Sequence, residues 1–267
     1  MVTVTIEGNK KQYPVGTTYE VIAAEYQDKY DGLIGLVAVD GKIKELFKQL
    51  KKDCEISFFT LKDDVGNKTY VRTATMLFLK AVSDVFGDDV AQAARVEFAV
   101  KNGTYITAVD KLTATVENAE KIKNRMKELQ EKAVPFMKDS YYMDDAMALF
   151  KEKGMKDKER LFRYRRSSMV NLYEIDGYYD YYYGYMLPNA GYVKWFDVIA
   201  YDEGFMLLLP DKKEPTIVRP FMEQKKLFKT LKESEKWAKE IGLETVGELN
   251  DRICNGSLSD LILVQEA

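Results

Sequence analysis

The sequence predicts an α+β fold, with a small strand-rich region at the N-terminus and a larger mixed region after it. The string VTVTIEG alternates apolar and polar residues, as a half-buried strand does. The dipeptides Asp40-Gly41 and Asn102-Gly103 each separate two strand-like runs and favour two-residue hairpin turns. Longer segments such as YVRTATMLFLKAVSDVFG, residues 70–87, are typical of helices.

Residues 1–62 are expected to form a β-grasp, ubiquitin-like unit. The predicted order is strand, strand, helix, strand, strand, strand. Thr17 or Thr18 would cap the helix, because threonine side chains accept hydrogen bonds from helix N-termini. The predicted elements are strands within VTVTIEG and KKQYPVG, a helix within GTTYEVIAAEYQ, two strands within LIGLVAVDGKIKEL, and a strand within CEISFFTL.

Residues 63–210 are expected to form a second, α+β unit. Its first helix would end at Gly87, because glycine favours the backbone conformation that closes a helix. The other predicted elements are a hairpin at 94–108, helices at 116–134 and 142–154, and strands in the tyrosine-rich stretch 178–185 and in 194–210. Residues 211–267 are expected to form a connector. It would begin with an extended segment and contain helices within 224–242 and 245–256.

Composition excludes several classes of site. The chain has 267 residues, of which 46% are hydrophobic and 31% charged, and its net charge is −3. It has no histidine, which removes every Ser-His-Asp and Cys-His nucleophile and the commonest neutral metal ligand. No GxxxxGK[ST] phosphate loop occurs, so the chain itself cannot be a P-loop kinase.

Partners and location are also predicted from composition. The mild negative charge gives no dominant basic field, so nucleic acid is not an expected partner. The apolar runs are too short to cross a membrane. The two cysteines, Cys54 and Cys254, lie near opposite ends and indicate a reducing cytoplasm rather than a disulfide framework.

Particular strings carry a resemblance to known families. YPVGTTYEVIAAEY, GLVAVDGKIKEL and ISFFTLKDDVGNKTYVR resemble a TGS domain, the β-grasp module that opens threonyl-tRNA synthetase. The next region resembles the editing domain of that synthetase. Together with LYEIDGYYDYYYGYMLPNAGYVKWFDV and EKWAKEIGLETVGELNDRI, it resembles the N-terminal half of bacterial uridine-kinase-like nucleoside kinases. The resemblance implies a kinase domain beyond this chain, which would use ATP and Mg.

The resemblance places one half of the editing site on a helix. The family's Arg-His-Ser-x-x-His motif falls on residues 72–77, where Arg72 is kept. Thr73 and Leu77 replace its two histidines. The chemistry that the family performs with these histidines is therefore expected to be lost.

The other half of that site falls in the tyrosine-rich stretch. The family's Asp-x-Cys-x-Gly-x-His-x-Pro motif falls on residues 180–188, where Asp180 and Gly184 are kept. Tyr182 replaces the cysteine and Met186 replaces the last histidine. The resemblance therefore implies a repurposed editing cleft with no catalytic residues and no metal.

We predict that this cleft binds a nucleoside or nucleotide. On a strand, Tyr182 would share a face with Asp180, and tyrosine rings stack on bases while their hydroxyls form hydrogen bonds. Arg163 and Arg165 would hold phosphate through forked donors. A half-buried sheet, solvated arginines and a site filled by its larger side chains are the structural alternatives. The candidate ligand-binding residues are Arg72, Thr73, Leu77, Arg163, Arg165, Asp180, Tyr182 and Met186.

The first functional hypothesis is a non-catalytic regulatory or ligand-binding region of a nucleoside kinase, which would dock on its kinase domain. A tRNA-binding or trans-editing module related to threonyl-tRNA synthetase is the alternative. A dimerisation or interaction module is a further alternative, and a homo-oligomer stays open.

Overall fold

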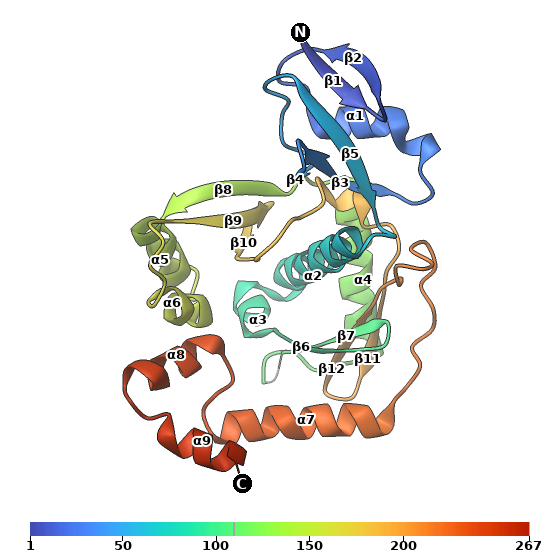
Figure 1. The fold of residues 1–267 in the computed structure, drawn as a ribbon. Helices are drawn as coiled ribbons and strands as arrows, with labels where there is room; N and C mark the ends of the chain where they lie inside the picture. Colours follow the sequence, from blue (N-terminus) through green and yellow to red (C-terminus); the bar gives the residue numbers. More distant parts are fainter. Residues whose placement is uncertain (109, 267) are drawn as a thin grey trace. The chain divides into compact units, whose positions relative to one another are not determined.

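The computed structural model, which describes residues 1–108 and 110–266, divides the chain into two compact units (Figure 1). The first unit contains Met1–Lys138 and Tyr173–Met222, and the second contains Asp139–Leu172 and Glu223–Ala267. Contacts therefore group the chain differently from the predicted boundaries after residues 62 and 210. Those boundaries stay a prediction about domains. Within the described residues, no helix is long and apolar enough to cross a membrane.

The N-terminal sheet of the first unit has five strands in the order β2-β1-β5-β3-β4. β1 is parallel to β5, and the other neighbours are antiparallel. β1 buries Val2, Val4 and Ile6 and leaves Thr3 and Thr5 partly exposed, which is the alternation that its sequence predicts. The elements are β1 (Val2–Ile6), β2 (Asn9–Tyr13), α1 (Tyr19–Tyr26), η1 (Gln27–Lys29), β3 (Ile34–Val39), β4 (Lys42–Glu45) and β5 (Cys54–Thr60).

The predicted order of strands and helix in this region is the observed one. Asp40 and Gly41 form the turn between β3 and β4 with positive φ angles of 50° and 77°, as a tight hairpin requires. Thr18 is the residue that precedes α1, although its side chain forms no cap hydrogen bond. The assignment of this region to the TGS family stays a prediction.

Helix α2 (Asp64–Phe86) is longer than predicted at its N-terminal end. It begins six residues before Tyr70, within DDVGNK, a string that is typical of a loop. Gly66 is needed there, because a Cβ at that position would lie 2.0 Å from the carbonyl oxygen of Thr60. The predicted end is confirmed, since Gly87 comes directly after the helix with a φ of 101°.

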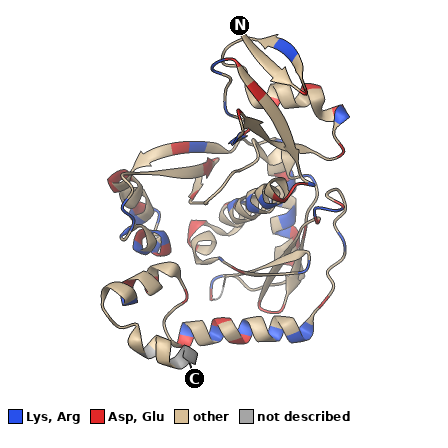
Figure 2. Cartoon of the chain, viewed as in Figure 1, with Lys and Arg blue, Asp and Glu red and all other residues tan. Residues whose placement is uncertain are grey.

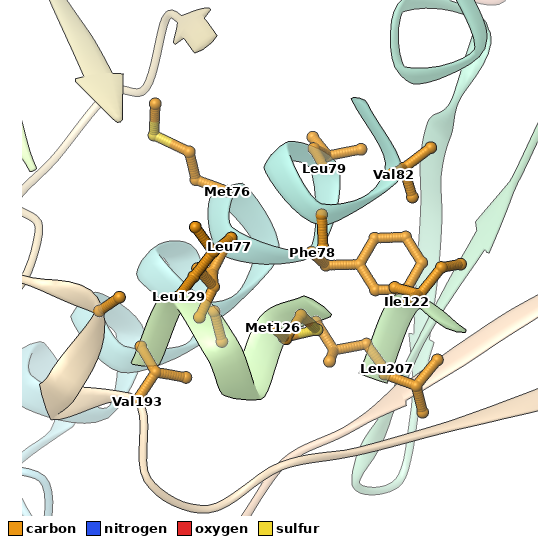
Figure 3. Close-up of a cluster of buried hydrophobic side chains, with 14 of the residues drawn as sticks. Met76, Leu77, Phe78, Leu79, Val82, Ile122, Met126, Leu129, Val193 and Leu207 are labelled. Atoms are coloured by element: carbon orange, nitrogen blue, oxygen red, sulfur yellow. The ribbon is translucent and has the colours of Figure 1, made fainter. Parts of the chain in front are cut away.

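A second sheet of the first unit has the order β11-β12-β7-β6, and α2 and α4 pack on each other within the same core. Figure 3 shows side chains of α2, α4 and β12 gathered there, among them Leu77, Met126 and Leu207. The predicted hairpin is present, but Val100 pairs with Gly103, so its turn is Lys101-Asn102 instead of Asn102-Gly103. The helix predicted at 116–134 is also present and ends earlier, at Glu131. The elements are α3 (Asp88–Ala93), β6 (Arg95–Val100), β7 (Gly103–Thr107), α4 (Val116–Glu131), η2 (Ala190–Tyr192), β11 (Asp197–Tyr201) and β12 (Gly204–Leu208).

The tyrosine-rich stretch is not a continuous strand, so that prediction was wrong. Strand β10 covers only Tyr178–Asp180, and residues 181–189 form a loop. The Asp180 carboxylate accepts a hydrogen bond from the backbone N–H of Tyr181, and Gly184 has a φ of 143°. The predicted alternation of tyrosines between two faces therefore ends at Asp180.

A third sheet, β10-β9-β8, contains two of the three boundaries between the units, and the third follows Met222. One boundary falls within β8 (Met137–Tyr142) and the other within β9 (Met169–Ile175). Because both crossings are in strands, the chain leaves the first unit and returns to it in extended conformation.

The described residues of the second unit contain helices in two separate parts of the sequence. Phe150 and Phe162 pack with ring centroids 5.1 Å apart, and Arg160 forms ion pairs with Glu248 and Asp251. Predicted helices matching α5, α7 and α8 are present, whereas α6 and α9 were not predicted. The elements are α5 (Met143–Glu152), α6 (Lys156–Phe162), α7 (Lys225–Glu240), α8 (Val246–Cys254) and α9 (Ser259–Glu266).

Candidate functional site

Helix α2 and the loop of residues 181–189 meet in the first unit and form the candidate site. The Thr73 hydroxyl oxygen accepts a hydrogen bond from the backbone N–H of Leu187 at 3.0 Å and lies 3.5 Å from Sδ of Met186. Beside it, the Arg72 guanidinium donates to the carbonyl oxygen of Tyr185 at 2.5 Å. The two predicted halves of the site therefore lie together, although they are more than 100 residues apart in the sequence.

Thr73, Leu77 and Met186, which we call the inner set, have no exposed surface. The Thr73 hydroxyl donates to the carbonyl oxygen of Thr69, so its hydrogen-bonding groups are used within the protein. Buried side chains thus fill the interior of the site, and the inner set presents no surface to a ligand in this conformation. Ligand binding by these residues stays a prediction.

Arg72, Tyr182 and Tyr183, which we call the outer set, retain exposed surface. Arg72 and Tyr182 are partly buried, and Tyr183 is 89% exposed. The Arg72 guanidinium packs against Gly184, where a Cβ would come within 2.5 Å of it. Glycine at position 184 therefore makes room for the arginine head group.

Electrostatics differ between the members of the outer set. Burial lowers the pKa of Arg72 from its usual value, against the opposing effect of Tyr173 and Tyr182. An arginine still keeps its charge, because its ordinary pKa is far above neutrality. Burial, together with the charge of buried Asp180, raises the pKa of Tyr182 well above its usual value. The outer set therefore presents one cation beside the protonated phenol of Tyr182.

Three residues that the sequence analysis missed hold the loop in place. The Tyr173 hydroxyl lies 2.6 Å from the carbonyl oxygen of Gly184 and 2.8 Å from Oε1 of Glu45, and these two oxygens are the acceptors within reach of its single O–H. Nζ of Lys138 lies 2.6 Å from the same Glu45 oxygen. Burial, and after it the Glu45 charge, raises the pKa of Tyr173. We call Glu45, Lys138 and Tyr173 the buried triad.

The alternation of β4 could have revealed one member of this triad. Lys42 and Lys44 share one face of the strand, which places Glu45 on the inward face with Ile43. Glu45 is 3% exposed, and a carboxylate so deeply buried needs a partner. Nothing local identifies that partner, because Lys138 is 93 residues away.

The donor set at the four replaced positions does not suit zinc. They present a hydroxyl, an isobutyl group, a phenol and a thioether, whereas zinc sites in proteins use thiolate, imidazole and carboxylate. Among the described residues no group of three or more His, Cys, Asp or Glu is placed to hold a metal ion. Absence of bound zinc stays a prediction that elemental analysis tests.

Arg163 and Arg165 belong to the second unit. Arg163 is exposed, and its guanidinium lies 4.0 Å from the Asp251 carboxylate. The Arg165 guanidinium lies 5.2 Å from the centre of the Phe162 ring. These neighbours are all in the second unit, and the phosphate-binding role of the two arginines stays a prediction.

Comparison with curated proteins finds threonine–tRNA ligases. The chain is 27% identical to that of Symbiobacterium thermophilum over 203 residues, which are 74% of this chain and 31% of the relative. It is 28% identical to that of Syntrophotalea carbinolica over 232 residues, or 80% and 36% of the two chains. No protein-family model matches the chain. The chain thus spans about a third of the length of these relatives and contains a region similar to the editing region of threonyl-tRNA synthetase.

These relatives correct the first functional hypothesis. They are tRNA ligases, so the prediction of a regulatory region of a uridine or nucleoside kinase was wrong. The strings that suggested a kinase contain no GxxxxGK[ST] phosphate loop, so they rested on resemblance alone. We therefore do not keep the hypothesis that this chain docks on a kinase domain that uses ATP and Mg.

Proposed function

We propose that this chain is a tRNA-binding region related to threonyl-tRNA synthetase, and that it does not hydrolyse mischarged tRNA with the residues of the ancestral site. The observation that supports this most directly is the similarity to threonine–tRNA ligases over about three quarters of the chain. The closed inner set supports the loss of hydrolysis, because Thr73, Leu77 and Met186 have no exposed surface.

The outer set offers a surface for an exposed nucleotide of the tRNA. Tyr183 presents nearly its whole ring to solvent, and aromatic side chains stack on unpaired bases. Arg72 donates to Tyr185 through one nitrogen, and the guanidinium has five N–H donors in all. A base stacked on the Tyr183 ring and a phosphate bound by the Arg72 guanidinium would suit these two side chains. This mode of binding agrees with the prediction from the sequence that the site binds a nucleoside or nucleotide.

The net charge of −3 argued against a nucleic acid partner, and the charges are also mixed locally. Figure 2 shows basic and acidic residues interspersed along α7 instead of a single basic stripe. Stacking needs no such stripe, so we expect binding that depends only weakly on salt. The reducing cytoplasm, where tRNA is used, suits the two free cysteines.

The experiment measures binding of labelled tRNA by fluorescence anisotropy at several salt concentrations. Tyr183→Ala should weaken binding by about 1–3 kcal/mol, the usual contribution of one stacked base. Tyr142→Ala is the matched control, because Tyr142 is 66% exposed and lies in the second unit. Failure of the wild-type chain to bind tRNA, or equal loss in both variants, would contradict the proposal.

An interaction module is a second candidate, favoured by apolar side chains exposed on the second unit. Trp237 of α7 is 40% exposed, Ile253 of α8 is 51% exposed and Leu263 of α9 is 64% exposed. A second copy of the chain would cover such surfaces. Light scattering across a range of protein concentrations tests self-association, and a monomer at the highest concentration would exclude it.

A further inference from the structure

A cavity in the first unit lies away from the inner set. Its volume is about 470 Å³, within the range of about 300–1,000 Å³ that is usual for small-molecule sites. One side comes from α1, η1 and the start of β3, and the other from η2 and the residues after it. The lining residues that matter here are Ala24, Gln27, Asp28, Leu33, Tyr192 and Lys194.

Hydrogen bonds fix the walls of this cavity. The Gln27 amide donates to the carbonyl oxygen of Gly32 and accepts from the backbone N–H of Ile34, both at 2.9 Å. Across the cavity, Asn189 donates to the Glu20 carboxylate at 2.9 Å, and Glu20 also bonds Tyr192. The walls are therefore already ordered without a ligand, which lowers the entropic cost of binding.

Two side chains of opposite charge, Asp28 and Lys194, lie on the cavity lining. Both are exposed, and neither forms an ion pair with another residue that the structure describes. Ala24 and Leu33 add apolar surface to the same lining. A molecule that occupies the cavity thus meets one anion, one cation and a small apolar wall.

We propose that this cavity binds a small zwitterion, a molecule with an ammonium group for Asp28, a carboxylate for Lys194 and a short apolar body. Free α-amino acids and short peptides share this chemistry. A ligand with one charge would leave the second side chain without a partner, so both charges contribute to selection. Zwitterion binding is independent of the proposed tRNA role, because neither charged residue belongs to the outer set.

Titration calorimetry with the full chain tests the site. The probes are glycine, alanine, threonine and leucine, the dipeptide glycyl-alanine, and the singly charged acetate and ethylamine. We expect zwitterions to bind at millimolar concentration or better and the singly charged probes to bind about tenfold more weakly. Tighter binding of the amino acids than of glycyl-alanine would indicate that the site takes free amino acids. Tighter binding of glycyl-alanine would indicate short peptides.

Variants on the exposed lining locate the binding. Asp28→Asn and Lys194→Gln should each weaken binding about tenfold, and Ala24→Phe should also weaken it by narrowing the cavity. Glu55→Gln and Lys51→Gln are the controls, because both residues are exposed and neither lines the cavity.

Circular dichroism confirms that each variant is folded. The proposal is overturned if no zwitterion binds the wild type, if acetate or ethylamine binds as tightly as the zwitterions, or if the lining variants bind like the controls. None of the probes contains a nucleotide, so these outcomes leave the tRNA experiment unaffected.

Discussion

The inner and outer sets of the candidate site lie side by side on the same helix and loop, yet they have opposite properties. Arg72 is partly exposed and charged, whereas the next residue, Thr73, is fully buried. On the loop, Tyr183 is exposed and Met186 is buried. Side chains that fill the core therefore lie directly below a polar, aromatic surface. Changes in the interior of the site and changes on its surface can therefore be tested separately.

The largest expected effect tests the buried triad, which holds the loop that joins the two sets. Glu45→Ala removes a buried carboxylate, leaves the partly buried Lys138 without its partner and removes one acceptor of Tyr173. Breaking a buried ion pair in this way costs about 3–5 kcal/mol. Urea unfolding should show this loss, and Glu55→Ala, at an exposed position of β5, should change the free energy of unfolding little. Equal stability of both variants would show that the triad does not hold the loop.

The second prediction separates the two sets by their contribution to the core. Leu77→Ala creates a cavity in a fully buried position, so it should lower the free energy of unfolding by about 2–5 kcal/mol. Tyr183→Ala, in the outer set, should change it by less than about 0.5 kcal/mol. Leu227→Ala is the control for the leucine change, since Leu227 is 45% exposed. A small effect of Leu77→Ala would mean that the interior of the site is not closed.

The third prediction concerns the one polar group of the inner set. Thr73→Val keeps the side-chain shape but leaves the backbone N–H of Leu187 buried without an acceptor. We expect a loss of about 1–3 kcal/mol, the cost of an unsatisfied buried donor. Thr73→Ser keeps the hydroxyl and should lose less. Amide hydrogen exchange at Leu187 distinguishes the two variants, and identical protection in both would contradict this role.

The smallest prediction concerns stability at alkaline pH. Burial raises the pKa of Tyr173 in the folded chain, whereas an unfolded tyrosine has a pKa of about 10. The stabilisation is complete below the unfolded value and decreases as pH rises, because the unfolded chain then loses the proton first. Each such group contributes a slope of about −1.4 kcal/mol per pH unit to the free energy of unfolding.

Tyr173→Phe removes one of these groups, so the slope above about pH 10 should be about 1.4 kcal/mol per pH unit shallower than in the wild type. Tyr70, whose pKa burial also raises, continues to contribute in both proteins. Urea unfolding at several alkaline pH values measures the slope. An unchanged slope would show that Tyr173 loses its proton equally readily in both states.

The parts of the fold that were predicted correctly depend on neighbours in sequence. Asp40-Gly41 makes its turn, and Gly87 ends α2, because each needs only its own backbone conformation. The early start of α2 was missed because it depends on Gly66, which the close carbonyl oxygen of Thr60 requires. A contact with the preceding strand decides that case, and local composition does not show it.

The candidate site shows the same limit. The motif positions located the meeting of α2 and the loop, but the tyrosine alternation failed after Asp180. In the loop after Asp180, Arg72 contacts Gly184 and donates a hydrogen bond to the carbonyl oxygen of Tyr185. Arg72 lies more than 100 residues earlier in the chain. The buried triad was missed for the same reason, since Glu45 and Lys138 are distant in sequence. The loop after Asp180 and the buried triad both depend on long-range polar contacts, and such contacts leave no periodic pattern in the sequence.

The division of the second unit into two segments has a consequence for synthesis on the ribosome. Its helix α6 packs on α8, and Arg160 of α6 pairs with Glu248 and Asp251 of α8. About 75 further residues must therefore be synthesised after the first segment, residues 139–172, before its partner α8 begins. During that time the intervening segment, Tyr173–Met222, completes the first unit. The two units thus finish in a fixed order, and nascent chains that stop before α8 should expose residues 139–172 to proteases or chaperones.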